Sequence, residues 1–189
     1  MDQLAALGIA RSEFDRRLRA VGPGDWDRPT PCEGWTVRDL VQHVVTGSNM
    51  AASLFSGCST AEAVALHDDT TFPEDPVVAF SDVADAAARA AAVDGAMEGI
   101  CHHPAGDFPG HVMLGFLVGD YALHAWDLAR AIGADETLPA NLVETVWAEV
   151  EPLIPVIPQT GVYGAGPSGT VPEDAPLQTR LLDATGRRP

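Results

Sequence analysis

The 189 residues are 46% hydrophobic and 20% charged, which is enough apolar material for one buried core and too much for a disordered chain. The formal charge of -16 arises from 27 acidic residues against 11 basic ones, all arginine, so a basic face for nucleic acid or an anionic membrane is not expected. We expect a single cytoplasmic domain over 1–189, because no secretory signal and no membrane-length apolar run are visible.

Helical periodicity predicts the first elements. Apolar residues recur at helical spacing over 3–20, which indicates an amphipathic helix. Residues 21–35 are dense in Gly and Pro, and they predict a long loop of the kind that is often functional. Thr36 has the position of an N-cap, and Asp39 three residues later completes a capping box. A second helix is therefore predicted from residue 37, and it contains His43.

The middle of the chain alternates breaks and helices. Residues 58–75 are polar and turn-rich, whereas 76–100 are alanine-rich and predict a third helix. Residues 101–110 form another break. The most apolar segment, 111–132, predicts a fourth helix that stops at Gly133, the residue type preferred just past a helix end.

The C-terminal part changes character. A shorter helix is predicted at 139–151, and the Pro- and Gly-rich residues 152–176 indicate an ordered tail without helix. Long helices joined by loops are typical of helix bundles, which build metal and ligand sites between facing helices. The predicted fold is all-α, a four-helix bundle over about 1–151 with a Pro/Gly-rich tail over 152–189 that wraps it.

Three chemistry-bearing residues lie among apolar ones. Asp120 and His124 are four positions apart on the fourth helix, so their side chains point the same way and can hold one ion. His43 lies in similar surroundings on the second helix, and the two faces would meet in a bundle. Two imidazoles and one carboxylate suit zinc, nickel or iron, and three protein ligands leave positions open for water or substrate.

Simpler interpretations of these residues stay open. A helical histidine is often a hydrogen-bonded structural residue, and an Asp four positions before a His is often only an ion pair. Asp127 and Arg130 are interpreted as a surface ion pair on the fourth helix. The other histidines are expected at the surface: His67, His102, His103 and His111. The cysteines are expected to be free thiols: Cys32, Cys58 and Cys101.

Three separated segments resemble a known family. They are PTPCEGWTVRDLVQHVV at 29–45, DYALHAWDLARAIG at 120–133 and VPEDAPLQTRLLDATGRRP at 171–189. Together they are similar to the DinB-like metal-binding proteins, in the branch that resembles the N-terminal domain of mycothiol-dependent maleylpyruvate isomerase. The resemblance implies a four-helix bundle with a divalent metal, commonly zinc, held by residues at the positions of His43, Asp120 and His124. Asp120 stands where the isomerase has Glu, and its shorter arm alters the metal distance or preference.

The resemblance also implies a low-molecular-weight thiol cofactor such as mycothiol. An open cationic site would raise the thiolate fraction of such a thiol at neutral pH. The resemblance attributes to the isomerase a second, C-terminal domain that we expect this protein to lack, so substrate contacts are expected from 21–35, 58–75 and the tail. The aromatic candidates for pocket walls are Trp35, Trp126 and Tyr163.

The leading hypothesis is a metal-dependent enzyme that uses a thiol cofactor as an S-transferase or isomerase on a small electrophile. One alternative keeps the metal without the thiol, as a hydrolase or a tailoring enzyme of secondary metabolism. Another is a metal-binding protein without turnover. No catalytic residue beyond the ligands is assigned. A homodimer through an exposed helix face is compatible with the composition, and no heptad pattern specifies one.

Overall fold

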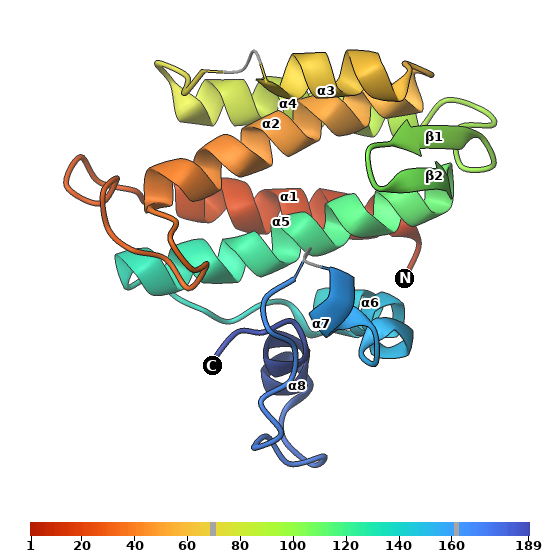
Figure 1. Ribbon diagram of the computed structural model, residues 1–189. Coiled ribbons are helices and arrows are strands. Elements are labelled where there is room, and N and C mark those ends of the chain that lie inside the picture. The colour runs from red at the N-terminus through yellow and green to blue at the C-terminus, as the bar shows by residue number, and fades with distance from the viewer. Residues whose placement is uncertain (69–70, 161–162) are drawn as a thin grey trace.

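The fold is mostly helical. A computed structural model describes residues 1–68, 71–160 and 163–189. Its helices are α1 (Gln3–Leu18), α2 (Val37–Phe55), α3 (Thr60–Asp68), α4 (Pro76–Ala91), α5 (Gly110–Ile132), α6 (Ala140–Val150), α7 (Ile157–Thr160) and α8 (Leu177–Ala184) (Figure 1). A two-stranded antiparallel hairpin, β1 (Ile100–His103) and β2 (Gly106–Pro109), precedes α5. The predicted all-α class is thus corrected to a helical fold with one small hairpin.

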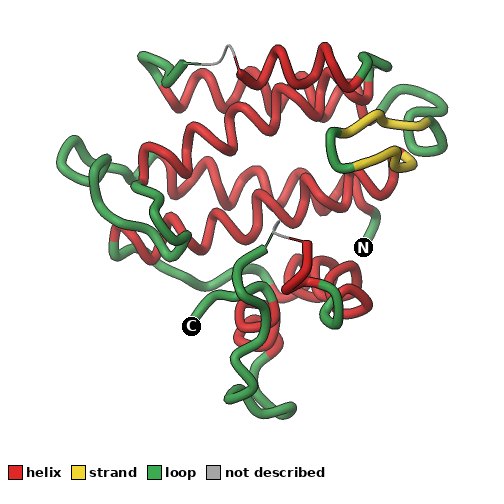
Figure 2. The backbone as a smooth tube through the Cα atoms, viewed as in Figure 1, coloured by secondary structure: helices red, strands yellow, loops and turns green. Residues whose placement is uncertain are grey.

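The long helices pack around a shared core. α1 lies along α5 and α2 along α4, and further contacts join α2 to α5 and α1 to α4 (Figure 2). At their centre the fully buried rings of Phe14, Phe80 and Tyr121 meet, with centroids 4.8 Å apart for Phe14 and Phe80 and 5.3 Å apart for Phe80 and Tyr121. The Tyr121 hydroxyl donates to Ser48 Oγ on α2 at 2.8 Å. These contacts hold α2 and α5, which carry the candidate ligands, in a fixed relation.

Local signals place the start of α2 and the end of α5 where the sequence predicts them. Thr36 and Asp39 form the predicted capping box, in which each side chain accepts from the other residue's backbone N–H. Gly133 ends α5 in the left-handed conformation, with φ of 73°. Between these limits, every residue of α5 from 121 to 129 is buried. A polar side chain on this stretch therefore meets protein on whichever face it lies.

Four predicted segments differ from the structure. Helix α3 occupies part of the supposed loop 58–75, because Ser59 and Glu62 cap its first turn; residues 69 and 70 lie outside the described residues. The alanine-rich helix ends at residue 91 rather than 100, before a turn in which Gly95 has φ of 82°. The break at 101–110 contains the hairpin, and the tail contains the short helix α7.

The tail returns to α5 and closes one side of the molecule. Helix α8 packs under α6, with Leu181 and Leu182 buried in the core. Gln178 anchors α8 to the segment after α5, since it donates to the Glu136 carbonyl and accepts from Leu138 N–H, both at 2.9 Å. In Figure 1 the chain beyond α7 runs beneath α5 to the C-terminus. We call residues 163–189 the C-terminal strap.

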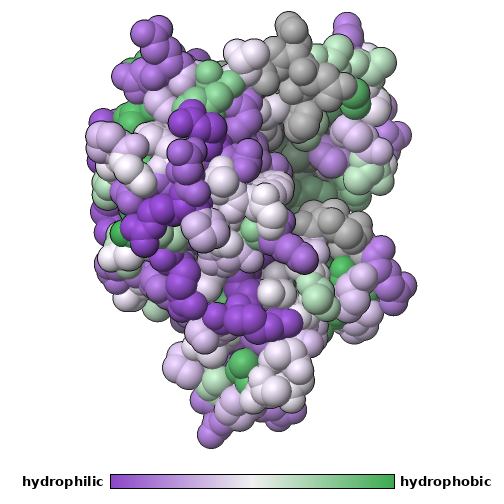
Figure 3. Space-filling view, turned by 60° about the vertical axis from the view of Figure 1, so that its left-hand side comes forward, coloured by the Kyte–Doolittle hydropathy of each residue, from purple (hydrophilic) through white to green (hydrophobic). Residues whose placement is uncertain are grey.

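One face of the surface is mainly polar, as expected for a chain with one buried core. The face in Figure 3 is dominated by hydrophilic residues, and the hydrophobic ones visible there are scattered. Among the described residues, no helix combines the length and apolar character needed to cross a bilayer.

Candidate metal centre

The structure brings together the three residues that the sequence selects. His43 comes from α2, Asp120 and His124 come from successive turns of α5, and one ligand atom of each lies within 4.8 Å of the others. Asp120 is the shared neighbour: its Oδ1 lies 3.2 Å from His43 Nε2 and 3.4 Å from His124 Nε2. The two imidazole centroids are 5.1 Å apart. Both rings therefore present the same nitrogen to one side of the carboxylate.

These distances fit a tetrahedral ion. Two donors bound about 2.1 Å from zinc at a tetrahedral angle lie about 3.4 Å apart. The nitrogen–oxygen distances of 3.2 and 3.4 Å match that edge length. Two neutral imidazoles and one carboxylate carry a charge of -1, so a divalent ion in this set retains about one positive charge.

One side of the cluster is open and the other is closed. The side chains of His43 and Asp120 are 37% and 27% exposed, whereas that of His124 is 10% exposed. Trp35, from the loop before α2, packs against both imidazoles, with centroids 4.9 Å from His43 and 6.0 Å from His124. Solvent thus reaches the side chains of His43 and Asp120, while an indole borders both rings.

A second layer of polar groups lies behind His124. Its Nδ1 donates to Asp127 Oδ2 at 2.9 Å, on the ring edge opposite the cluster. Arg187, from the C-terminal strap, donates to both oxygens of that carboxylate, Nε to Oδ1 at 3.2 Å and Nη2 to Oδ2 at 2.7 Å. The Cys32 thiol adds a donor to Oδ2 at 3.3 Å. Asp127 is fully buried, so these donors replace its water.

The expected surface pair of Asp127 with Arg130 is wrong. Arg130 instead forms a bidentate pair with Glu136, both bonds being 2.7 Å. Because α5 is buried on every face at residue 127, the Asp127 carboxylate meets the strap instead of solvent. A spacing of three within a helix allows the Asp127–Arg130 pair. The carboxylate of Asp127 is instead covered by Arg187, which lies sixty positions later in the chain.

Burial and neighbouring charges shift the pKa values of Asp120 and His124. Burial would raise the pKa of Asp120, but His124 and His43 more than offset it and hold that pKa well below its usual range. Burial would lower the pKa of His124, yet Asp120 and Asp127 hold it well above the ordinary value. Without an ion, His124 therefore keeps protons on both ring nitrogens, each facing a carboxylate. A divalent cation would take the place of the Nε2 proton.

Comparison with known proteins assigns the chain to a family. Residues 7–129 match the family described as mycothiol maleylpyruvate isomerase N-terminal domain. The chain belongs to this family. Two uncharacterized proteins of Mycobacterium tuberculosis, from strains H37Rv and CDC 1551, are each 31% identical to the chain over 154 residues, covering 82% of this chain and 80% of theirs.

Two solved structures share the fold of this chain. Crystal structures of the mycothiol-dependent maleylpyruvate isomerase and of a mutant of that enzyme superpose with TM-scores of 0.62 and 0.63, at 21% and 19% identity. Each comparison covers 78% of this chain and 68% of the isomerase. The family match ends at residue 129, so Arg187 lies in a part of the chain outside it.

The remaining sequence candidates are dispersed. Trp126 is buried in the core, with the Arg130 guanidinium 4.5 Å from its ring centroid. Tyr163 is half-buried, and burial, followed by the charge of Asp120, raises the pKa of its hydroxyl. A pocket-wall role for these two residues stays a prediction. Among the other histidines, His102 and His111 are exposed and His103 is half-buried, while the His67 side chain lies outside the described part.

Sequence reasoning missed Asp127, Arg187 and the placement of Cys32. A signal for Asp127 was present, because it follows His124 by three positions on a helix and can meet the other edge of its ring. Arg187 lies in the C-terminal segment that carries the family resemblance, but nothing local links it to α5.

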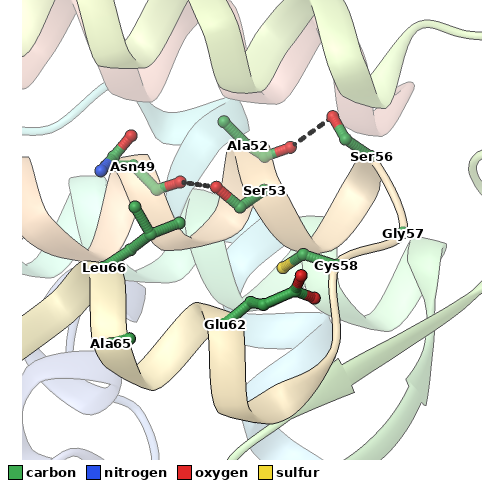
Figure 4. Close-up of a pocket in the computed structure, with 9 residues that line it drawn as sticks. All are labelled: Asn49, Ala52, Ser53, Ser56, Gly57, Cys58, Glu62, Ala65 and Leu66. Carbon is green, nitrogen blue, oxygen red and sulfur yellow. Dashed lines mark hydrogen bonds between the residues drawn. The ribbon is translucent and has the colours of Figure 1, made fainter.

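Two surface hollows are lined by none of the three candidate ligands. The first, of about 1010 Å³, lies between α2 and α3. In Figure 4 the Cys58 sulfur and the Glu62 carboxylate face each other there. Burial, and then the Glu62 charge, raise the pKa of the Cys58 thiol, which keeps it protonated and poorly nucleophilic.

The second hollow, of about 480 Å³, is lined by three arginines, Arg28, Arg130 and Arg188, together with Pro29 and Pro31. Each guanidinium already has a carboxylate partner: Asp25, Glu136 and Asp183 respectively. The hollow therefore carries little net positive charge, and neither hollow competes with the cluster as a reactive site.

Proposed function

We propose that this protein is a divalent-metal-dependent enzyme that uses a low-molecular-weight thiol of the mycothiol type as an S-transferase or isomerase on a small electrophile. His43, Asp120 and His124 would hold the ion, with zinc the best fit, on a DinB-like four-helix bundle. The observation that carries the proposal is the convergence of these three donor atoms beside a solvent-open side.

The donor set supports catalysis over a purely structural ion. Structural zinc sites are closed by four protein ligands, whereas catalytic ones keep a position for water or substrate. Cys32 is the nearby thiol, but it approaches the Nδ1 edge of His124, at 3.9 Å, while the candidate ligand atom is Nε2. Cys32 therefore does not complete the coordination of the same ion.

The proposed chemistry needs few groups from the protein. A bound divalent ion would lower the pKa of a coordinating thiol from about 8.5 toward neutrality. Trp35 would border the cofactor sulfur and limit water on that side, since its ring lies against both imidazoles. Tyr163 and Trp126 remain candidates for contacts to a small-molecule substrate. A macromolecular polyanion is a poor substrate for a chain of net charge -16.

Metal analysis tests the proposal directly. Protein purified without chelator should contain about one divalent ion per chain, and His43→Ala, Asp120→Ala and His124→Ala should each lose it. A matched control is His102→Ala, which removes an exposed histidine paired with Asp107 at 2.8 Å on the hairpin and should leave the metal content unchanged. Wild-type protein without stoichiometric metal would overturn the proposal.

A second experiment tests the thiol. Cobalt-substituted protein should develop a sulfur-to-cobalt charge-transfer absorption when mycothiol is added, and the His124→Ala variant should not. An unchanged cobalt spectrum would favour the thiol-independent hydrolase or tailoring enzyme over a thiol transferase.

A further inference from the structure

Asp127 is the most heavily hydrogen-bonded carboxylate near the cluster. Its Oδ2 accepts from His124 Nδ1, Arg187 Nη2 and Cys32 Sγ, and its Oδ1 accepts from Arg187 Nε. The carboxylate is fully buried, and the Arg187 side chain is 9% exposed. The proposed function assigns no task to this pair.

We propose that Asp127 and Arg187 are positioning residues that aim His124 at the metal, and that they couple metal affinity to docking of the C-terminal strap. The inference rests on the proposed metal site. It goes beyond that site because Arg187 lies outside the residues matched to the family.

The first step concerns the tautomer of His124. A neutral imidazole has one N–H and one lone pair, and the hydrogen bond made by one nitrogen decides which nitrogen binds metal. Asp127 accepts at Nδ1, so the proton stays there and the lone pair belongs to Nε2, the atom 3.4 Å from Asp120. Such carboxylate–histidine pairs also fix ring orientation and raise the basicity of the ligand nitrogen.

The second step concerns the charge of Asp127. An ionised carboxylate without water is costly unless it is paired and hydrogen-bonded. Arg187 supplies a two-pronged guanidinium contact, and its own Nη1 is satisfied by the Thr185 carbonyl at 3.0 Å. If the strap undocks, Asp127 loses this cation and gains water, and its hold on His124 weakens.

The third step is thermodynamic reciprocity. Any factor by which the docked strap tightens metal binding is the factor by which bound metal favours docking. Within the strap, the backbones of Gly164 and Gly186 approach closely, and Gly186 directly precedes Arg187, which reaches Asp127 on α5. Loss of that contact should therefore be felt at the metal.

Zinc dissociation constants, measured by chelator competition, test the positioning role. Asp127→Asn and Arg187→Met should each weaken zinc binding by about 10- to 100-fold, as expected for loss of an outer-shell partner. In case a single replacement leaves an unpaired buried group and prevents folding, the double variant Asp127→Leu/Arg187→Met removes both charges and should fold yet bind zinc as weakly.

The control is Leu54→Ala, a buried truncation about 16 Å along α2 from His43. It should lower stability and leave the zinc dissociation constant unchanged. A general loss of stability would then not explain weaker zinc binding in the positioning variants.

Protease cleavage of the strap supplies the reciprocal readout. Zinc should slow cleavage of the wild-type strap by about 10-fold or more, and the double variant should show no zinc effect. Wild-type zinc affinity in the folded variants would overturn this inference alone. Failure of the wild-type protein to bind zinc would overturn the proposed function and this inference with it.

Discussion

Gly186 offers a sharp test of how the strap is held. Its φ of 80° is in the left-handed region, and a Cβ there would lie 2.7 Å from both Gly164 Cα and Gly164 C and 2.8 Å from Ala165 N. These are backbone atoms, so no side chain can rotate out of the way. Gly186→Ala must therefore strain residue 186 and push two backbone segments apart.

The expected loss follows from those two effects. Left-handed backbone costs about 1–2 kcal/mol for a residue with a Cβ, and forced overpacking costs about 1–3 kcal/mol. Their sum of about 2–5 kcal/mol corresponds to a drop of roughly 5–15 °C in Tm for a chain of this length. Differential scanning calorimetry measures it, and zinc affinity should fall as well because Arg187 is the next residue.

Gly169→Ala is the matched control for this prediction. Gly169 is also in the strap, with φ of 74°, but a Cβ there would have no heavy atom within 4 Å. This variant should lose only the left-handed cost of about 1–2 kcal/mol and keep its zinc affinity. Equal losses of stability in the two variants would refute the argument that close backbone approach docks the strap.

Three further predictions concern buried charge. Arg17→Met should lower the free energy of unfolding by about 3–5 kcal/mol, because the buried Arg17 guanidinium donates to the Asp135 and Thr137 carbonyls. Urea denaturation measures this loss, and unchanged stability would contradict it. Asp127 has a pKa lowered to about 2: burial raises it, but His124 and Arg187 more than offset that effect. An unfolded Asp titrates near 3.9, so the lowered pKa contributes about 2–3 kcal/mol of stability above about pH 4. This contribution is lost as the pH falls toward 2. Acid titration of Asp127→Asn should not show that loss. Zinc binding near pH 7 should release about one proton, because His124 has a raised pKa and must give up its Nε2 proton; calorimetric heats that do not vary with the buffer would refute this.

Local chemistry accounts for what the sequence predicts well. The capping box of Thr36 and Asp39 and the glycine at 133 involve only residues within one helical turn, so their meaning does not depend on the rest of the fold. The convergence of Asp120 and His124 likewise follows from helical geometry alone. His43 needed the further assumption that α2 faces α5, which the structure supports with a 5.1 Å separation of the two imidazole rings.

Some wrong predictions concern segments whose local signals compete with the composition around them. Ser59 and Glu62 repeat the cap pattern that marks α2, yet the polar composition around them favoured a loop. Asp94 and Gly95 are a turn signal, but the alanine run before them suits a helix of almost any length. The hairpin strands have four residues each, too few to show alternation.

The environment of Asp127 belongs to a different class of problem. Its sequence neighbours are compatible with an ordinary surface pair with Arg130. The cost of burying the Asp127 carboxylate depends on whether a cation from a distant part of the chain pairs with it. That cation is Arg187, sixty residues later, and it follows a glycine at 186 where two segments of the strap lie in close contact. The candidate ligands are thus encoded by spacing on two helices, whereas the groups proposed to orient one of them are brought together by the tertiary fold. Changes in the strap should for that reason alter metal affinity without altering any ligand.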